Sequence, residues 1–470
     1  MSAAGKFGRY WLALPLAFYL LLPTRTFYWD GVAFAIAAEK HAPLRETLHP
    51  SHLIYIPCAV WLYSAAEALG LKIRALFLLQ TTNSLLAAAA VVLIFRSLRR
   101  RAIGEAPSLA AALAFAFAAT WWKFATDANA YVPAILLLLW ANDLLERRRS
   151  PIAAGLACCA AMLFHELAIL FVPVALWRVG MSGPDSQSAG RPLGLRLVSA
   201  LGGKSALRFA AAALTPVALA YLAAARIVTD AWSLPHTLAW AVSHSPDSSF
   251  SWNPLRDAHW TLLGTLRLFF GGKPGLVLGA AALAFPASRR NAWLWLALYA
   301  VFLFFWMPQN TFYRMFYLAP LILLCATWRI GARALPWLAA ALFLWNAAFF
   351  ILPQSRAANN PPLRFALDQQ PRWPAGVPIV FHIFHPDLWT ISYFNQQAAW
   401  IGFPERDYPL LDRNLAAARS IGQPLWIEAT AYDFLAAAED GRRWLSQHED
   451  PSRNITFHDR GREFRFYAMR

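Results

Sequence analysis

Carboxylates, histidines and one arginine stand at the ends of long apolar runs in this sequence of 470 residues. These candidates are Asp30, His49, His52, Asp127, His165 and Arg314. A carboxylate can accept a proton as a general base, while histidine and arginine can donate hydrogen bonds to phosphate oxygens. If their loops share one side of a membrane, these residues would form an outward-facing cleft. The alternative is that they are ordinary charges on solvated loops.

The composition excludes an ordinary water-soluble protein. Hydrophobic residues make up 58% of the sequence and charged residues only 14%, against about 25% charged residues in a typical soluble domain. The apolar residues come in blocks of about 15–25, and a helix needs about 20 residues to cross a bilayer. We therefore expect an all-α polytopic membrane protein, with the lipid bilayer as its first partner.

The net charge of +16 indicates membrane topology. Basic segments separate the apolar blocks at residues 96–107, 142–151, 178–208, 286–291 and 328–336. With the first ten residues, these segments hold 18 Lys and Arg against four acids, and so carry +14 of the +16. Positive charge concentrated in such loops is typical of the cytoplasmic side. We therefore predict a cytoplasmic N-terminus, and we exclude nucleic acid as a partner.

The apolar blocks predict about eleven crossings within a membrane domain of residues 1–353. The first outer loop covers about residues 28–72, and its helix at 53–70 is expected to lie on the outer leaflet, because a crossing there would place Arg96–Arg101 outside. The expected spans are 10–23, 73–95, 108–124, 130–145, a two-helix hairpin over 151–177, 209–228, 275–287, 292–307, 315–328 and 336–352.

The composition changes after Pro353, where residues 354–470 mix polar and apolar types. Short apolar runs predict strands at Val377–Phe384, Pro424–Thr430 and Phe464–Ala468. Residues 431–447 have the spacing of one amphipathic helix. An odd number of crossings from a cytoplasmic N-terminus places this small α/β domain outside the membrane.

Three stretches carry motifs in a fixed order. They are Tyr28-Trp29-Asp30-Gly31 followed by Leu48-His49-Pro50-Ser51-His52-Leu53-Ile54-Tyr55, then Asn129-Ala130-Tyr131, and then Gly155–Pro173 with Phe164-His165-Glu166-Leu167 in its middle. The set resembles the GT-C superfamily of integral-membrane glycosyltransferases, and most closely an uncharacterised bacterial family related to the protein O-mannosyltransferases. The resemblance covers residues 8–180, extends more loosely over 300–352, and does not reach 354–470.

The sequence departs from that family at three points. Ala33 stands where the family has an acid, Asn129 stands where it has a glutamate, and Ser51-His52 replaces a Pro-Gly pair. Asp127 lies two residues before Asn129 and is a candidate substitute for the missing glutamate.

The resemblance implies an enzyme that transfers a sugar from a polyprenyl-phosphate donor to an acceptor hydroxyl, on the outer face of a bacterial inner membrane. The acceptor could be a protein, a lipid or a glycan. On this interpretation Asp30 is the catalytic general base, and a bound divalent cation is an option that some GT-C enzymes use. No metal-ligand spacing is visible, so we predict no metal and no other cofactor. The predicted substrate-binding residues are Asp127, His49, His52, His165 and, for the lipid phosphate, Arg314.

Two other interpretations stay open. A transporter or flippase for a lipid-linked glycan would use the same outer residues for binding alone. Transporters usually have repeated halves with matching Gly/Pro breaks, and the break at Gly271–Gly275 has no counterpart in the first half of the sequence. A structural subunit whose outer domain binds a partner is the third interpretation.

Overall fold

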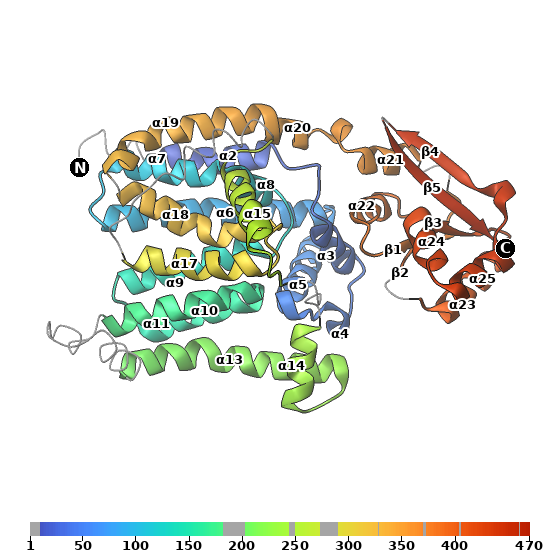
Figure 1. The fold of residues 1–470 in the computed structure, drawn as a ribbon, viewed down its shortest axis with the longest axis horizontal. Helices are drawn as coiled ribbons and strands as arrows, with labels where there is room; N and C mark the ends of the chain where they lie inside the picture. Colours follow the sequence, from blue (N-terminus) through green and yellow to red (C-terminus); the bar gives the residue numbers. More distant parts are fainter. Residues whose placement is uncertain are drawn as a thin grey trace. The chain divides into compact units, whose positions relative to one another are not determined.

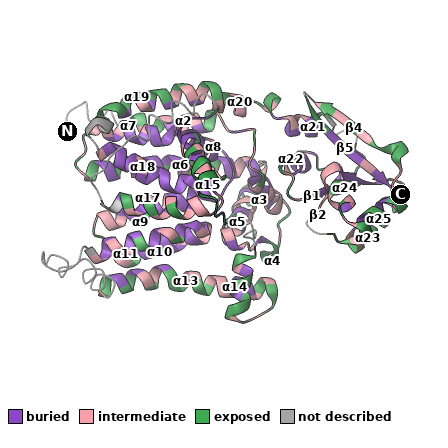
Figure 2. Cartoon of the chain, in the orientation of Figure 1, coloured by how far each residue is buried: buried purple, intermediate pink, exposed green. Residues whose placement is uncertain are grey.

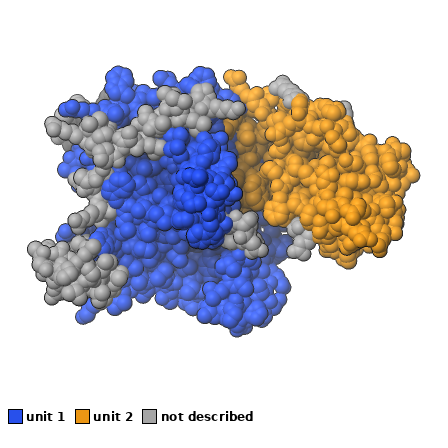
Figure 3. Space-filling model, viewed as in Figure 1, with its two compact units in different colours: residues 1–24, 37–353 blue, residues 25–36, 354–470 orange. Residues whose placement is uncertain are grey.

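The computed structural model of the chain describes residues 10–181, 203–243, 250–272, 290–327, 329–369, 373–403, 406–459 and 461–470. The chain divides into two compact units (Figure 3). The first unit combines residues 1–24 with 37–353, and the second combines residues 25–36 with 354–470. The second unit therefore includes the short segment that carries Asp30, which the sequence alone assigned to the membrane domain.

The first unit is a bundle of helices, many of which run roughly parallel (Figure 1). Its first half contains the 3-10 turn η1 (Trp11–Ala13), α2 (Leu14–Leu21), the end of α3 (Trp29–Glu39), α4 (Leu44–Thr47), η2 (Pro50–His52), α5 (Tyr55–Ala68), α6 (Ala75–Arg100), α7 (Glu105–Ala116), α8 (Ala119–Ala125), α9 (Tyr131–Glu146), α10 (Pro151–Phe164), η3 (Glu166–Phe171) and α11 (Val172–Met181).

The second half of the bundle packs against the first. It contains α13 (Lys204–Thr229), α14 (Leu234–Val242), α15 (Pro254–Phe269), α17 (Arg290–Phe305), η6 (Phe312–Arg314), α18 (Met315–Thr327), α19 (Arg329–Asn346), the π-helical turn η7 (Ala347–Ile351) and the start of α20 (Leu352–Ser355). The predicted span at 275–287 lies outside the described residues. Helices α14 and α15 were not predicted.

By length and composition, three described helices could cross a membrane: Ala75–Arg100, Lys204–Thr229 and Arg333–Ser355. The pair α7 and α8 would make a fourth span if it is counted as one broken helix. Shorter apolar helices of 10–17 residues accompany them, among them Trp11–Leu21 and Pro151–Phe164. The helical membrane-type fold is thus confirmed in outline, while the count of eleven crossings stays a prediction.

The predicted span at 108–124 is broken, because α7 and α8 meet at an angle of 68°. Two carbonyl groups at the break bond to side chains from elsewhere in the chain. The Tyr19 hydroxyl donates to the Ala116 carbonyl at 2.8 Å, and the Asn346 amide donates to the Phe117 carbonyl at 2.8 Å. A helix bends where a side chain takes over carbonyls that would otherwise bond within it.

Three of the segments predicted to be cytoplasmic meet at one end of the bundle. Arg101 from the end of α6 pairs with Glu146 at the end of α9, and Arg178 of α11 lies 3.7 Å from the same carboxylate. Arg100 pairs with Asp143. These ion pairs hold basic segments together, as a shared side of the membrane requires.

Helix α13 forms an outer face of the bundle (Figure 2). Leu207 and Leu219 on this helix are 60% and 61% exposed. Apolar side chains exposed along a helix of 26 residues are typical of a surface that faces lipid.

The second unit contains one five-stranded sheet with the order β2-β1-β3-β5-β4. Its strands are β1 (Pro378–His382), β2 (Ala399–Phe403), β3 (Leu425–Glu428), β4 (Ile455–Asp459) and β5 (Arg462–Met469). Strand β1 is parallel to β2 and β3, whereas β5 is antiparallel to β3 and β4. Alternate residues of β1 face opposite sides, so Ile379 and Val380 enter different apolar clusters.

Helices cover this sheet. They are α21 (Pro361–Gln369), α22 (Pro386–Phe394), α23 (Tyr408–Ser420), α24 (Ala429–Ala436) and α25 (Glu439–His448), with 3-10 turns at Ala357–Asn359 and Pro451–Arg453. The single helix predicted over 431–447 is two helices, and Pro361 and Pro362 begin α21.

Candidate functional site

Asp30 lies in the first turn of α3, within the part of the chain that packs with the C-terminal domain. The Arg25 backbone N–H donates to the Gln354 carbonyl at 2.7 Å, and the Asn360 amide donates to the Arg25 carbonyl. The Phe27 and Phe394 rings stack at 5.5 Å. The C-terminal domain therefore fixes the chain a few residues before Asp30.

The Asp30 carboxyl group has an unusual acidity for an aspartate. Burial raises its pKa to about 7, and a hydrogen bond with Tyr28 lowers it only in part. A carboxyl group with a pKa near neutral pH can take up and release a proton under physiological conditions, which suits a general base.

Three predicted histidines come together in the first unit. The His49 and His52 rings stack at 4.8 Å, and the His165 ring lies 5.5 Å from His52. The Nδ1 atoms of His49 and His165 accept backbone hydrogen bonds from Ser51 and Leu167, so each histidine caps the short 3-10 helix that follows it. Their other ring nitrogen, Nε2, carries the proton in the neutral form.

Asp127 is fully buried, and its carboxylate is directed at Lys123. The Lys123 ammonium lies 3.8 Å from one carboxylate oxygen, and the Ala128 N–H donates to the other at 2.9 Å. The neighbouring Asn129 accepts hydrogen bonds from the first two N–H groups of α9. Asp127 thus positions Lys123, which was not among the predicted site residues.

Arg314 is also fully buried, in the turn between α17 and α18. Its guanidinium donates to the carbonyl groups of Asn310 and Pro308, the latter at 2.7 Å. It passes so close to α15 that a Cβ at Gly264 would lie 2.7 Å from the guanidinium carbon. This geometry orders the turn, and the role of Arg314 in phosphate binding stays a prediction.

A cavity of about 350 Å³ with two cations in its lining lies among α8, α15 and η7. We call it the cationic pocket, and its lining includes Lys123, Arg267, Thr120, Thr311, Phe124 and Phe312. Lys123 is half-buried, whereas Arg267 is exposed. Arg267 stands on a helix that the sequence analysis did not predict, so the pairing of these two cations was missed.

Asn346 supports Gly271, a residue that lines the cationic pocket. Its side chain accepts the Gly271 N–H at 2.9 Å and donates to the carbonyl groups of Phe117 and Phe269, both at 2.8 Å. At Gly271 any side chain would collide with the Phe350 ring, which comes within 2.2 Å of an added Cβ. One buried amide therefore ties together the α7–α8 break, the end of α15 and the end of α19.

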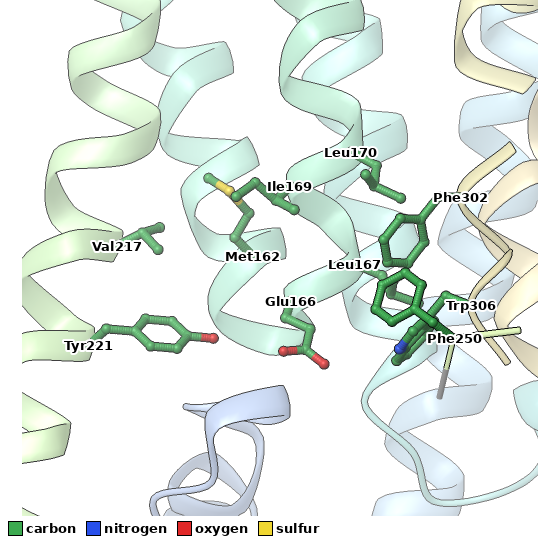
Figure 4. A pocket seen from close by; sticks show the side chains of 10 residues that line it. All are labelled: Met162, Glu166, Leu167, Ile169, Leu170, Val217, Tyr221, Phe250, Phe302 and Trp306. Carbon is green, nitrogen blue, oxygen red and sulfur yellow. The ribbon is translucent and has the colours of Figure 1, made fainter. Parts of the chain in front are cut away.

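A second cavity, of about 420 Å³, contains a carboxyl group (Figure 4). We call it the acidic pocket, and its lining includes Glu166, Tyr221, Leu170, Phe250, Phe302 and Trp306. Aromatic rings connect it to the cationic pocket, because Tyr313 contacts Trp306 at 5.0 Å and Phe312 at 4.6 Å. Tyr313 also lies 5.9 Å from His165. The histidines and both pockets thus surround one aromatic cluster.

Within the described ranges, no group of three or more His, Cys, Asp or Glu side chains is arranged to hold a metal ion. The prediction of a site without metal is not tested by this observation.

No family model matches the sequence, and no curated protein matches it. Among solved structures, the chain is similar to the crystal structure of ArnT from Cupriavidus metallidurans bound to undecaprenyl phosphate. The TM-score is 0.56 at 13% sequence identity, over 99% of this chain and 98% of that one. ArnT is a GT-C glycosyltransferase. The chain therefore shares its fold with this structure. The apo structure of the same enzyme gives a TM-score of 0.44 at 14% identity.

The GT-C resemblance predicted from the sequence is confirmed at the level of the fold. The fold likeness includes residues 354–470, which the sequence motifs did not cover.

Proposed function

We propose that this chain is a membrane glycosyltransferase that takes a sugar from a polyprenyl-phosphate donor. The observation that carries the proposal is the likeness over 99% of the chain to ArnT, whose crystal structure holds undecaprenyl phosphate. The cationic pocket supports it, because Lys123 and Arg267 offer the charge that a lipid phosphate needs. The bacterial inner membrane, with the C-terminal domain outside, is part of the same proposal.

The proposed reaction is a single displacement at the anomeric carbon of the donor sugar. The acceptor hydroxyl oxygen forms a bond to that carbon, while the bond from the carbon to the phosphate oxygen breaks. The electron pair leaves with the lipid phosphate, and Asp30 takes the hydroxyl proton. Attack opposite the leaving group inverts the configuration of the sugar. No metal or redox partner is needed to balance this step.

Lys123 and Arg267 are proposed to bind the departing phosphate. Charge-assisted hydrogen bonds to phosphate are roughly twice as strong as neutral ones. Asp127 holds the Lys123 ammonium in place at 3.8 Å, and the hydroxyl groups of Thr120 and Thr311 line the same cavity. The phosphate charge that develops on bond breaking would therefore meet donors that are already in position.

An apolar groove can hold the hydrocarbon tail of the donor. It has a volume of about 410 Å³, and its lining includes Trp11, Phe18, Leu113, Phe117 and Phe343 of α2, α7, α19 and the turns beside them. Phe117 bonds through its carbonyl to Asn346, which also supports the cationic pocket. The buried side chain of Asn346 would thus support both the groove that holds the tail and the pocket that holds the phosphate.

The test supplies the purified full-length chain with radiolabelled polyprenyl-phosphate sugar and with protein, lipid and glycan hydroxyls as acceptors, and it measures release of free lipid phosphate. Asp30→Asn should lower turnover by about 10²–10⁴-fold, the usual contribution of a general base. The control is Asp368→Asn, because Asp368 is an exposed carboxylate in the same unit.

Full turnover by the Asp30→Asn chain would contradict the assignment of the base. If the native chain moves the labelled lipid across a bilayer without releasing any lipid phosphate, it is a flippase and the proposed function is wrong.

A further inference from the structure

The proposed displacement reaction does not use the acidic pocket. Glu166 begins η3, where it directly follows His165, and Tyr221 belongs to α13. In Figure 4 the Tyr221 ring points toward Glu166, while Phe250, Phe302 and Trp306 gather at the other end of the cavity. The pocket therefore has one polar end and one apolar end.

The polar end suits hydroxyl groups. A carboxyl group accepts a hydrogen bond from a hydroxyl when it is ionised and can donate one when it is protonated. The Tyr221 hydroxyl donates its own proton to the Pro50 carbonyl at 2.5 Å, which leaves its oxygen free to accept. None of the described residues that line the pocket is a lysine or an arginine.

The apolar end suits a hydrocarbon chain or the apolar face of a sugar ring. Burial of apolar surface is worth about 25 cal/mol per Å², and Leu170, Val217 and Phe302 offer such surface. The cavity volume of about 420 Å³ falls in the range of about 300–1,000 Å³ for small-molecule sites. A phosphate fits poorly here, because no cation of the described lining offsets the cost of burying its charge.

We propose that the acidic pocket binds the acceptor, and that the acceptor is an uncharged amphiphile with a hydroxyl-bearing head. The head contacts Glu166 and Tyr221, and the apolar part lies against Phe302 and Trp306. This inference rests on the proposed glycosyltransferase function, since an acceptor exists only if sugar transfer occurs. The donor is excluded from this pocket by the charge of its phosphate.

The experiment compares two photoreactive probes with the same alkyl chain, an alkyl glucoside and an alkyl phosphate. The full-length chain in lipid nanodiscs is labelled without donor, and labelled peptides are identified by mass spectrometry. The glucoside should label peptides that contain Leu170 or Phe302 about tenfold more than the phosphate does, which corresponds to about 1.4 kcal/mol of preference.

Three variants test the pocket. Glu166→Lys should reverse the preference toward the alkyl phosphate, and Glu166→Gln should weaken it while keeping the glucoside bound. Val217→Trp should fill the cavity and abolish labelling by both probes. The control is Glu46→Lys, which makes the same charge change at an exposed residue outside the pocket. Unfolding of each variant in the same nanodiscs identifies any chain that has failed to fold.

Equal labelling by both probes, or an unchanged preference in the Glu166→Lys chain, would overturn the inference. Adding the polyprenyl-phosphate sugar then asks whether the bound glucoside is glycosylated. A glucoside that binds but receives no sugar, while lipid phosphate is released, also overturns it and leaves the proposed function intact. Selective labelling without any release of lipid phosphate overturns the proposed function instead.

Discussion

The cationic pocket and the acidic pocket contact one aromatic cluster, but they are built differently. The cationic pocket is held by fixed backbone: Gly271 is pinned between Asn346 and Phe350, and Gly272 has a positive φ of 81°. Apolar side chains form most of the acidic pocket, and Glu166 is the only carboxyl group in its described lining. The two pockets therefore differ in how their linings are built as well as in charge.

This difference has a physical meaning for a transfer enzyme. A phosphate is small and has the same shape in every donor, so fixed donors at fixed positions bind it well. A pocket of apolar side chains can adapt to bodies of different shape, because its contacts have no strict direction. On the proposed function, the cationic pocket binds the constant part of the reaction and the apolar lining of the acidic pocket binds the variable part.

Lys123 gives the most direct test of whether the two pockets act separately. Lys123→Met keeps much of the side-chain length and removes the charge, so release of lipid phosphate should fall by about 10²–10³-fold, as when one transition-state donor is lost. Labelling of the acidic pocket by the alkyl glucoside should not change. The same turnover assay on Lys72→Met, at an exposed lysine, provides the matched control. A Lys123→Met chain with normal turnover would mean that the cationic pocket is not the phosphate site.

Hydropathy is a local property of the chain, so the sequence predicted those helices of the first unit that are long apolar runs. It could not predict the break after Ala116, because the break depends on Tyr19 and Asn346, which are remote in the sequence. Helix α15 was missed because it carries charged residues such as Arg256, Asp257 and Arg267 and so has no apolar run. In the second unit, strands β2 and β4 were missed. Both are edge strands that pair on one side only, so their sequences are under weaker constraint.

The candidate site, like the fold, could be predicted only in part. His49, His52 and His165 were expected to lie close together because their loops share one end of the bundle, and their rings do lie close together. The contact of His165 with Tyr313 joins residues more than a hundred positions apart, and no local pattern encodes it. The pairing of Lys123 with Arg267 depends in the same way on the packing of α8 against α15.

The pH dependence of turnover tests the role of Asp30 without a change in either pocket. Its pKa is raised to about 7, and only the deprotonated carboxylate can accept the acceptor proton. Turnover should therefore rise with pH by about tenfold per unit below that value and level off above it, which gives about 10²-fold between pH 5 and the plateau. The measurement is kcat/KM for lipid-phosphate release across this range.

A variant in the second unit gives the control for this profile. Asn360→Ala removes the hydrogen bond to the Arg25 carbonyl without touching the carboxyl group of Asp30. It should lower turnover at every pH while keeping the midpoint of the profile. A profile that stays flat from pH 5 to pH 8 would show that Asp30 is not the base.

The support that Asn346 gives to the cationic pocket can also be tested. Asn346→Ala leaves the Gly271 N–H and two carbonyl groups without their partner, and a buried unpaired polar group costs about 1–3 kcal/mol. The free energy of unfolding should therefore fall by about 3 kcal/mol or more, and lipid-phosphate binding should weaken by about tenfold. Denaturant unfolding and binding of the free lipid phosphate measure the two effects. Asn253→Ala, which removes only the cap of α15, should cost about 1 kcal/mol. If Asn346→Ala weakens ligand binding in both pockets equally, then Asn346 supports both pockets and the cationic pocket is not held separately.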